Sequence, residues 1–241
     1  GAHAATHLRS LGHDVVVGSR TVPPASSQVA GLAFVEVDYV AGVDRALLSG
    51  YDAVVFSAGQ DVRHVAPDAA DPRFWAETQS EGVPAVARRA KEAGVRRFVQ
   101  VGSCYHQVLP ELAATNPYVA ARRDADLGVG ALADESFVAC TLNPPPIVGM
   151  LPEASGYFER IVAWARGRRS ERLPRLVAPP GGTNYLTVRS LSQAIAGALE
   201  RGEPGASYLV GDENLTYVEY FQAIVDLAGG TERVQVEDAP H

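Results

Sequence analysis

Cysteine is scarce in this sequence, with two residues, Cys104 and Cys140, among 241. A chain of this length with so few cysteines cannot hold a disulfide framework, which indicates a reducing compartment and predicts a cytoplasmic protein. The spacing of the two cysteines fits no zinc site. Long apolar runs are missing too, so the sequence predicts no membrane-spanning helix. No signal-peptide pattern opens the chain.

Positive charge is also in short supply. The chain has 21 Lys and Arg against 28 Asp and Glu, a formal net charge of −7 at pH 7. This balance argues against a protein that binds nucleic acid, because such proteins gather positive charge against the phosphates. With 46% hydrophobic and 20% charged residues, the chain can bury a core as one large domain, or as one domain with a small lobe.

Short apolar runs alternate with helical patterns through residue 149, and no internal repeat of fixed period is present. The runs that predict strands are Asp14–Gly18, Leu32–Val37, Asp52–Gly59, Phe98–Val101 and Phe137–Leu142. Such alternation predicts an α/β fold, a doubly wound parallel sheet with helices on both faces. The rhythm changes at Met150, which indicates a smaller C-terminal lobe.

A serine and a spaced tyrosine follow the central strand run, Phe98–Val101. Ser103 lies at the expected carboxyl end of that strand, where open parallel sheets bind their ligands. Tyr118 and Arg122 are four residues apart, so a helix places both on one face. The sequence therefore predicts a hydroxyl, a proton donor and a cation in one site.

Ser103 and the Tyr118-x-x-x-Arg122 pair resemble the Ser…Tyr-x-x-x-Lys constellation of the short-chain dehydrogenase/reductases, in the extended, epimerase/dehydratase-like branch. The resemblance extends over nearly the whole chain and departs at Arg122, where the family has lysine. It implies an NAD(P)-binding Rossmann domain at residues 1–149, a substrate-binding lobe mainly at 150–241, and a homodimer. Ser103, Tyr118 and Arg122 are then the expected catalytic residues.

The opening of the chain departs from the family as well. A helical pattern ends at Gly12 and a strand run follows, whereas the family begins with a strand and a T-G-x-x-G-x-x-G turn before such a helix. Gly1 aligns with the last glycine of that turn and is therefore assigned to cofactor binding. The first strand and the phosphate-binding loop are expected to be missing from this sequence. The alternative is a chain that simply starts with the helix.

The choice of cofactor depends on the end of the second family strand. Ser19 and Arg20 stand there, and no acidic residue does. An acid would hydrogen-bond a ribose hydroxyl, whereas an arginine accommodates a 2′-phosphate, so the cofactor is expected to be NADP, with NAD as the alternative. A solvated arginine at a strand end is the structural alternative.

Further cofactor contacts follow from the resemblance. Asp38, with Tyr39 beside it, is expected at the adenine, although Asp38 could instead cap the next helix. The remaining expected contacts are the small strand-end residues Ser57, Ala58 and Gly59 at the adenosine ribose, Gln79 in place of a family asparagine, and the stiff run Pro144, Pro145 and Pro146 at the nicotinamide face. Tyr105 and Asn143 are expected to contact the substrate. No metal ligands are expected.

Three functions remain open on these residues. The first is an NADP-dependent oxidoreductase acting on a carbonyl or alcohol of a small organic molecule, with Tyr118 passing the proton and Ser103 holding the substrate oxygen. The second is a nucleotide-sugar epimerase or dehydratase with tightly bound NAD, which Asn143 favours. The third is a catalytically degenerate, dinucleotide-binding regulatory protein, because an arginine in place of the lysine relays protons poorly.

Overall fold

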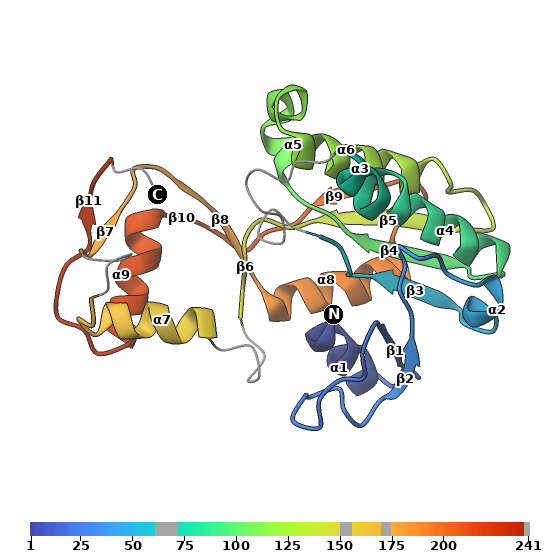
Figure 1. Cartoon of the computed structure of the whole chain (residues 1–241), viewed down its shortest axis with the longest axis horizontal. Coiled ribbons are helices and arrows are strands. Elements are labelled where there is room, and N and C mark those ends of the chain that lie inside the picture. The colour runs from blue at the N-terminus through green and yellow to red at the C-terminus, as the bar shows by residue number, and fades with distance from the viewer. Residues whose placement is uncertain (61–71, 150–155, 170–174, 239–241) are drawn as a thin grey trace. The chain divides into compact units, whose positions relative to one another are not determined.

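The computed structural model describes residues 1–60, 72–149, 156–169 and 175–238. The chain divides into two compact units, each built from two segments (Figure 1). Unit 1 comprises Gly1–Pro145 and Val188–Val210, and unit 2 comprises Pro146–Thr187 and Gly211–His241. The boundary expected at residue 149 lies close to the first crossing at Pro145, and the chain then returns to unit 1 for one helix and one strand.

Unit 1 is built on parallel strands. They are β1 (Val16–Ser19), β2 (Ala33–Glu36), β3 (Ala53–Phe56), β4 (Arg97–Val101), β5 (Val138–Asn143) and β9 (Ser207–Leu209). Four of them form a parallel sheet in the order β3-β4-β5-β9, and β1 pairs with β2 in parallel. Because all partners run in one direction, the carboxyl ends within each sheet lie at the same edge. The predicted parallel α/β architecture is confirmed.

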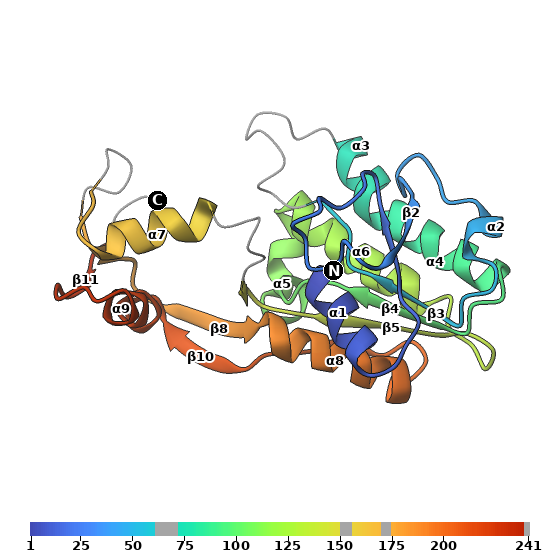
Figure 2. The ribbon, with the colours of Figure 1, turned by 90° about the horizontal axis from the view of Figure 1, so that it is seen from below.

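Helices cover both faces of the larger sheet, with α4 and α6 on one side and α1 and α8 on the other (Figures 1 and 2). The helices of unit 1 are α1 (Ala2–Ser10), α2 (Arg45–Leu48), α3 (Pro72–Trp75), α4 (Gly82–Glu92), α5 (Tyr105–Val108), α6 (Pro117–Gly130) and α8 (Val188–Arg201), with a 3₁₀ turn at Pro110–Ala114. In the described residues, no helix combines the length and the apolar character required to cross a bilayer.

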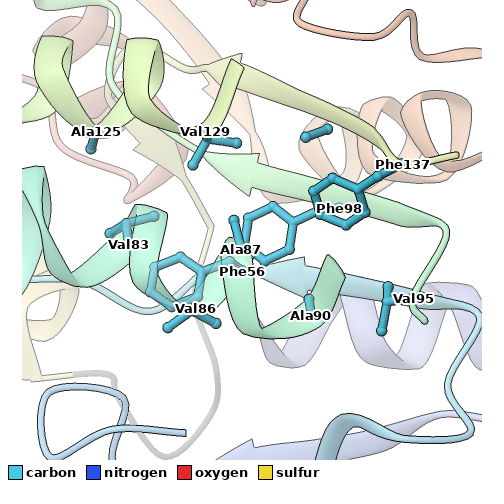
Figure 3. Close-up of a cluster of buried hydrophobic side chains, with 11 residues drawn as sticks. Phe56, Val83, Val86, Ala87, Ala90, Val95, Phe98, Ala125, Val129 and Phe137 are labelled. Carbon is cyan, nitrogen blue, oxygen red and sulfur yellow. The ribbon is translucent and has the colours of Figure 1, made fainter. Parts of the chain in front are cut away.

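The core follows from the alternation of side chains along the strands. Phe98 of β4 points into a cluster with α4 and α6, where it packs near Phe56 and Phe137 (Figure 3). The next residue, Val99, points into the opposite cluster, with Leu8 of α1 and Ile195 of α8 as neighbours. A strand buried on both faces reads as a continuous apolar run, which is why the sequence predicted it.

The helical segment between Arg73 and Ala93 is interrupted. A π-helical turn at Ala76–Ser80 separates α3 from α4. Gly82 follows this turn, and a Cβ at that position would collide with the carbonyl oxygen of Glu77. The glycine therefore permits the close approach that the wider turn requires, and π-helical turns of this kind occur often at functional sites.

Unit 2 holds two small sheets and two helices among its described residues. Its elements are β6 (Ile147–Val148), α7 (Gly156–Ala165), β7 (Val177–Ala178), β8 (Gly182–Thr187), β10 (Glu213–Thr216), α9 (Tyr217–Leu227) and β11 (Gln235–Val236). The strand orders are β10-β8-β6 and β11-β7. Trp164 of α7 packs against Phe221 of α9 in the core of this unit. A capping box of Thr216 and Glu219 is present at the start of α9.

Candidate active site

Ser103 follows β4 directly and is 6% exposed. Its backbone N–H donates to Oδ1 of Asn143 at the end of β5, over 2.9 Å. On either side of it, the N–H of Gly102 donates to the Leu142 carbonyl and the N–H of Cys104 donates to the Pro144 carbonyl. The turn that carries Ser103 is therefore fixed to the neighbouring strand at three successive residues.

Tyr118 lies in the first turn of α6. Asn116 caps this helix, since its side-chain oxygen accepts from the N–H groups of Tyr118 and Val119, and Pro117 occupies the first helical position, where its missing N–H costs nothing. The Tyr118 ring lies 5.2 Å from the ring of Trp75 and 6.5 Å from that of Tyr105, between centroids. Sequence local to the helix start thus places the phenol among aromatic side chains.

Arg122 stands one turn later on α6 and is 8% exposed. Its guanidinium carbon lies 5.9 Å from the centre of the Tyr118 ring, so the predicted pair does share one helix face. Nη1 donates to Oε1 of Gln79 over 3.0 Å. Nη2 donates to the carbonyl of Val101 over 3.2 Å and to that of Gly102, the residue before Ser103. Neutral acceptors at the end of β4 therefore hold the cation.

Gln79 holds this arginine from the π-helical turn. It is fully buried, and its Nε2 donates to the carbonyl of Gln60 over 2.8 Å while its Oε1 accepts from Arg122. Both the NH₂ group and the oxygen of its amide therefore bond other groups of the protein. Gln79 therefore supports Arg122 from the protein interior, and its expected contact with the cofactor stays a prediction.

The turn after β3 lies next to the side chains of Gln79 and Arg122. Ser57, Ala58 and Gly59 are exposed, and Gly59 has φ +152°, a backbone conformation that favours glycine. A Cβ on Gly59 would lie 3.1 Å from Nε2 of Gln79 and 3.3 Å from Nη1 of Arg122. The missing side chain keeps an open, exposed backbone directly above the arginine.

The N-terminal glycine comes to the same place from α1. Gly1 precedes that helix and is exposed. A Cβ on it would lie 3.0 Å from the Ser57 hydroxyl. The structure therefore brings Gly1 to the end of β3, beside the small residues that were assigned to the cofactor with it.

Tyr39 connects the end of β2 to this region. Its ring packs edge-on against Phe56 of β3, at 5.1 Å between centroids, and its hydroxyl donates to the Thr78 carbonyl over 2.9 Å. Burial raises the pKa of Tyr39, while the nearby Arg122 and Arg20 lower it and Asp38 raises it.

The other candidates at the ends of β1 and β2 are less buried. Arg20 is exposed and Ser19, the last residue of β1, is half-buried. Oδ1 of Asp38 accepts from the N–H of Val40 over 3.0 Å, and the helix that follows is capped by Asp44. Asp38 therefore closes a local turn and does not cap α2, which leaves its exposed side open to a ligand.

The residues after β5 divide between buried and exposed. Pro144 and Pro145 are buried, whereas Pro146 is exposed. Asn143 is fully buried, and its amide bonds the Ser103 N–H, Asp126, Gln107 and Ser207. The polar atoms of Asn143 therefore face protein groups, and its expected contact with the substrate stays a prediction. Tyr105, the other expected substrate contact, is 42% exposed.

Comparison with known proteins bears on this geometry. The sequence model described as the NAD dependent epimerase/dehydratase family matches residues 1–211. The chain belongs to this family. No curated protein sequence matches it. The family assignment therefore rests on the family model. It agrees with the resemblance that the spacing of Ser103, Tyr118 and Arg122 indicated.

Solved structures resemble the chain over nearly its whole length. The crystal structure of gox2253 gives a TM-score of 0.74 at 22% identity, with 98% of this chain and 74% of that chain covered. UDP-N-acetylglucosamine 4-epimerase from Bacillus cereus gives 0.72 at 14% identity, with 98% and 80% covered. RMD from Pseudomonas aeruginosa, complexed with NADPH, gives 0.61 at 19% identity, with 93% and 88% covered. At identities this low, the TM-scores show a common fold.

Sequence reasoning missed several residues of this epimerase/dehydratase site. Trp75 packs on the Tyr118 ring. The buried Asp126 and the exposed Ser207 bond the amide of Asn143, and His106 bonds Asp126. One signal for it was available, because Asp126 stands four residues after Arg122 and so lies near it on the same helix. His106 and Ser207 gave no local signal, since only the tertiary fold brings them to α6.

Proposed function

We propose that this chain uses a nicotinamide dinucleotide to oxidise or reduce an alcohol or carbonyl carbon of a small organic substrate. The observation that carries the proposal is the arrangement at the end of β4: Arg122 lies 5.9 Å from the Tyr118 ring and bonds the carbonyl next to Ser103. A phenol that transfers a proton, a hydroxyl that holds an oxygen and a fixed cation are the groups this reaction requires.

The residues at the strand ends fit a dinucleotide. Gly59 presents bare backbone above Arg122, and the Nε of Arg122 is buried and has no partner among the described residues. We assign the nicotinamide half of the cofactor to Arg122, Pro145 and Pro146, which the buried residues Pro144 and Gln79 support from inside the protein. We assign the adenosine half to the exposed or half-buried residues Gly1, Ser19, Arg20, Asp38, Tyr39, Ser57, Ala58 and Gly59. Exposed small residues at a sheet edge suit close contact with such a ligand.

The side chains then divide the chemistry among them. When bound, the dinucleotide supplies or accepts the hydride. The Tyr118 hydroxyl gives a proton to the substrate oxygen, or takes one from it, while the Ser103 hydroxyl holds that oxygen. Arg122 supplies a fixed positive charge that stabilises negative charge on the phenol oxygen. A guanidinium keeps its protons, with a pKa above about 12, so Tyr118 exchanges its proton by a route that avoids Arg122.

We infer NADP as the preferred cofactor. Arg20 is exposed at the end of β1, where an arginine binds a 2′-phosphate and an acid would select the ribose hydroxyl. Support for either nicotinamide cofactor is general: RMD from Pseudomonas aeruginosa was solved with NADPH, while the family is described as NAD dependent.

Titration of the protein with NADPH and NADH tests the cofactor proposal. Wild-type protein is expected to bind NADPH more tightly, and Arg20→Ala is expected to weaken NADPH binding about tenfold, the loss of a charge-assisted bond of ~1.4 kcal/mol. Its binding of NADH should stay unchanged. Arg9→Ala is the matched control, because Arg9 is exposed and pairs with Asp14 on α1. Equal weakening of NADH by Arg20→Ala would show that Arg20 does not read the phosphate.

A second function is a nucleotide-sugar epimerase with tightly held NAD, for which the family match is the favouring observation. UDP-N-acetylglucosamine 4-epimerase from Bacillus cereus shares the fold. The buried position of Asn143 removes the argument that its amide orients the sugar. Release of NAD from protein denatured after purification, with no net cofactor turnover, would favour this function over the first. Dinucleotide binding with no turnover of a carbonyl or nucleotide-sugar panel would indicate a regulatory protein.

A further inference from the structure

A buried carboxylate lies behind the site, on the same helix as Arg122. Asp126 is 6% exposed, and its Oδ2 receives hydrogen bonds from three directions. Nδ2 of Asn143 donates over 2.9 Å, the Ser207 hydroxyl donates over 2.6 Å, and Nε2 of His106 lies at 2.9 Å. A carboxylate taken out of water requires such partners, because burying it unpaired is costly.

These donors keep Asp126 ionised. Burial raises the pKa of the Asp126 carboxyl, but hydrogen bonds from His106, Ser207, Asn143 and Thr141 outweigh it and leave the pKa below its ordinary value. At neutral pH the group is therefore a pure hydrogen-bond acceptor with a negative charge. It can accept from a neighbouring amide and can donate nothing.

Asn143 transmits this constraint to Ser103. It is fully buried; its Nδ2 faces the Asp126 carboxylate and its Oδ1 accepts from the Ser103 N–H over 2.9 Å. If the Asn143 amide were rotated by half a turn, its oxygen would face the Asp126 carboxylate and its NH₂ group would face the Ser103 N–H. Both contacts would be unfavourable. The ionised carboxylate thus selects the amide orientation that holds the Ser103 backbone.

The chain leaves room for this contact at Gly102. A Cβ there would collide with Oδ1 of Asn143 and lie 2.7 Å from the Thr141 side chain. The residue before Ser103 must therefore be glycine for the amide to reach its position. The glycine, the amide and the carboxylate form one connected arrangement.

We propose that Asp126 and Asn143 are positioning residues that aim the Ser103 hydroxyl: Asp126 fixes the amide of Asn143, and Asn143 fixes the backbone of Ser103. This inference rests on the proposed function, in which Ser103 holds the substrate oxygen. Asp126 touches neither substrate nor cofactor in that account. It acts through Asn143 alone.

The test compares Asp126→Asn with wild type in two measurements, steady-state kinetics and hydrogen exchange of the Ser103 N–H by NMR. Loss of the charge releases the Asn143 amide, so the Ser103 N–H is expected to exchange at least about tenfold faster. The kcat is expected to fall about 10- to 100-fold, as for a reacting group displaced by about 1 Å. Dinucleotide affinity is expected to stay within about twofold, because the strand-end contacts are untouched.

Two further variants separate positioning from general stability. Asp134→Asn removes a carboxylate outside this network, which pairs with Lys91 and accepts from the Ser136 N–H, so it should lower the unfolding temperature with little effect on kcat. The double change Asp126→Asn with Asn143→Asp keeps one carboxylate and one amide and restores an acceptor for the Ser103 N–H. Relative to Asp126→Asn, the double variant should have a higher kcat and slower exchange of the Ser103 N–H. If Asp126→Asn does not fold, the double variant is compared with wild type instead.

The outcomes are distinguishable from those of the proposed function. Unchanged exchange of the Ser103 N–H in Asp126→Asn, or parallel losses of kcat and dinucleotide affinity, overturns the positioning proposal. A double variant that folds but keeps fast exchange overturns it as well. Wild-type protein that binds no dinucleotide overturns the proposed function instead, and the exchange of the Ser103 N–H then decides the positioning proposal by itself.

Discussion

Arg122 and Asp126 are buried charges of opposite sign that stand one turn apart on α6, yet the protein directs them to different partners. The spacing would allow them to pair on the helix. Instead, Arg122 donates to Gln79 and to the carbonyls of Val101 and Gly102. Asp126 receives donors from Asn143, Ser207 and His106. Each charge is held by hydrogen bonds with groups of neighbouring elements.

The two charges differ in what they leave free. The Nε of Arg122 is buried without a partner in the described part of the chain, and the guanidinium lies beside the Tyr118 ring. The bonded oxygen of Asp126 is saturated by its donors. A charge fixed by dipoles keeps its direction without a mobile counter-ion. We therefore propose that Arg122 takes part in the reaction and that Asp126 belongs to the framework that holds Ser103.

The largest expected effect concerns the phenol beside the cation. Tyr118→Phe should reduce turnover about 100-fold or more, the loss typical of a general acid or base, because the proposed mechanism assigns the proton transfer to the Tyr118 hydroxyl. Steady-state kinetics and a dinucleotide titration measure the two parameters separately. Affinity should be retained. Tyr105→Phe is the matched control, and a larger loss there than in Tyr118→Phe would make Tyr105 the proton donor.

The cation itself gives the next effect. Arg122→Lys replaces a planar fork with a point charge that cannot serve Gln79 and two carbonyls together. At least one buried acceptor then loses its partner, so the free energy of unfolding should fall by about 1–3 kcal/mol, and turnover should fall with it. Urea unfolding measures the first quantity. Arg123→Lys is the control, since Arg123 is partly exposed and pairs with Asp124; its effect should stay within about 0.5 kcal/mol. Higher activity in Arg122→Lys would show that the site is not built around a guanidinium.

The smallest effect is the pH dependence that Asp126 contributes. Its pKa is lower in the folded protein than its ordinary value, so the unfolded chain takes up the proton first as pH falls. Its stabilising contribution is therefore complete above the unfolded pKa of about 3.9 and is lost as pH falls below it toward the folded pKa. Asp126→Asn should flatten the acid limb of the unfolding free energy against pH. Leu127→Ala, which changes an exposed neighbour, should keep the wild-type slope; parallel acid limbs for wild type and Asp126→Asn would contradict this assignment.

The fold was predictable where burial alone decides it. The strands β3, β4 and β5 carry mostly apolar residues, with Gln100, Thr141 and Asn143 as buried polar exceptions, so their positions follow from the sequence within a few residues. The π-helical turn before α4 was not predictable, because it depends on the approach of the Glu77 carbonyl to Gly82. The periodicity of apolar residues indicates one continuous helix, because it does not reflect contacts such as the one between Glu77 and Gly82.

The candidate site was predictable only in part. The spacing of Tyr118 and Arg122 placed both on one face of α6, because the period of a helix determines it. The positions of Gln79 and Asn143 were read from the resemblance as ligand contacts, and both side chains are fully buried. Which polar side chain faces a ligand and which faces a protein group depends on partners far along the chain, such as Ser207, 64 residues from Asn143. That information is tertiary.

An NADPH titration of ¹⁵N-labelled protein tests the central claim most directly, because it reports where a dinucleotide binds. The account predicts resonance shifts that saturate together at the amides of Ser57 and Gly59, at the Ser103 N–H and at the Nε–H of Arg122, while the amides of α2 stay unchanged. No shift at these positions up to about 1 mM NADPH, a binding free energy weaker than about 4 kcal/mol, would contradict it, as would shifts confined to other elements.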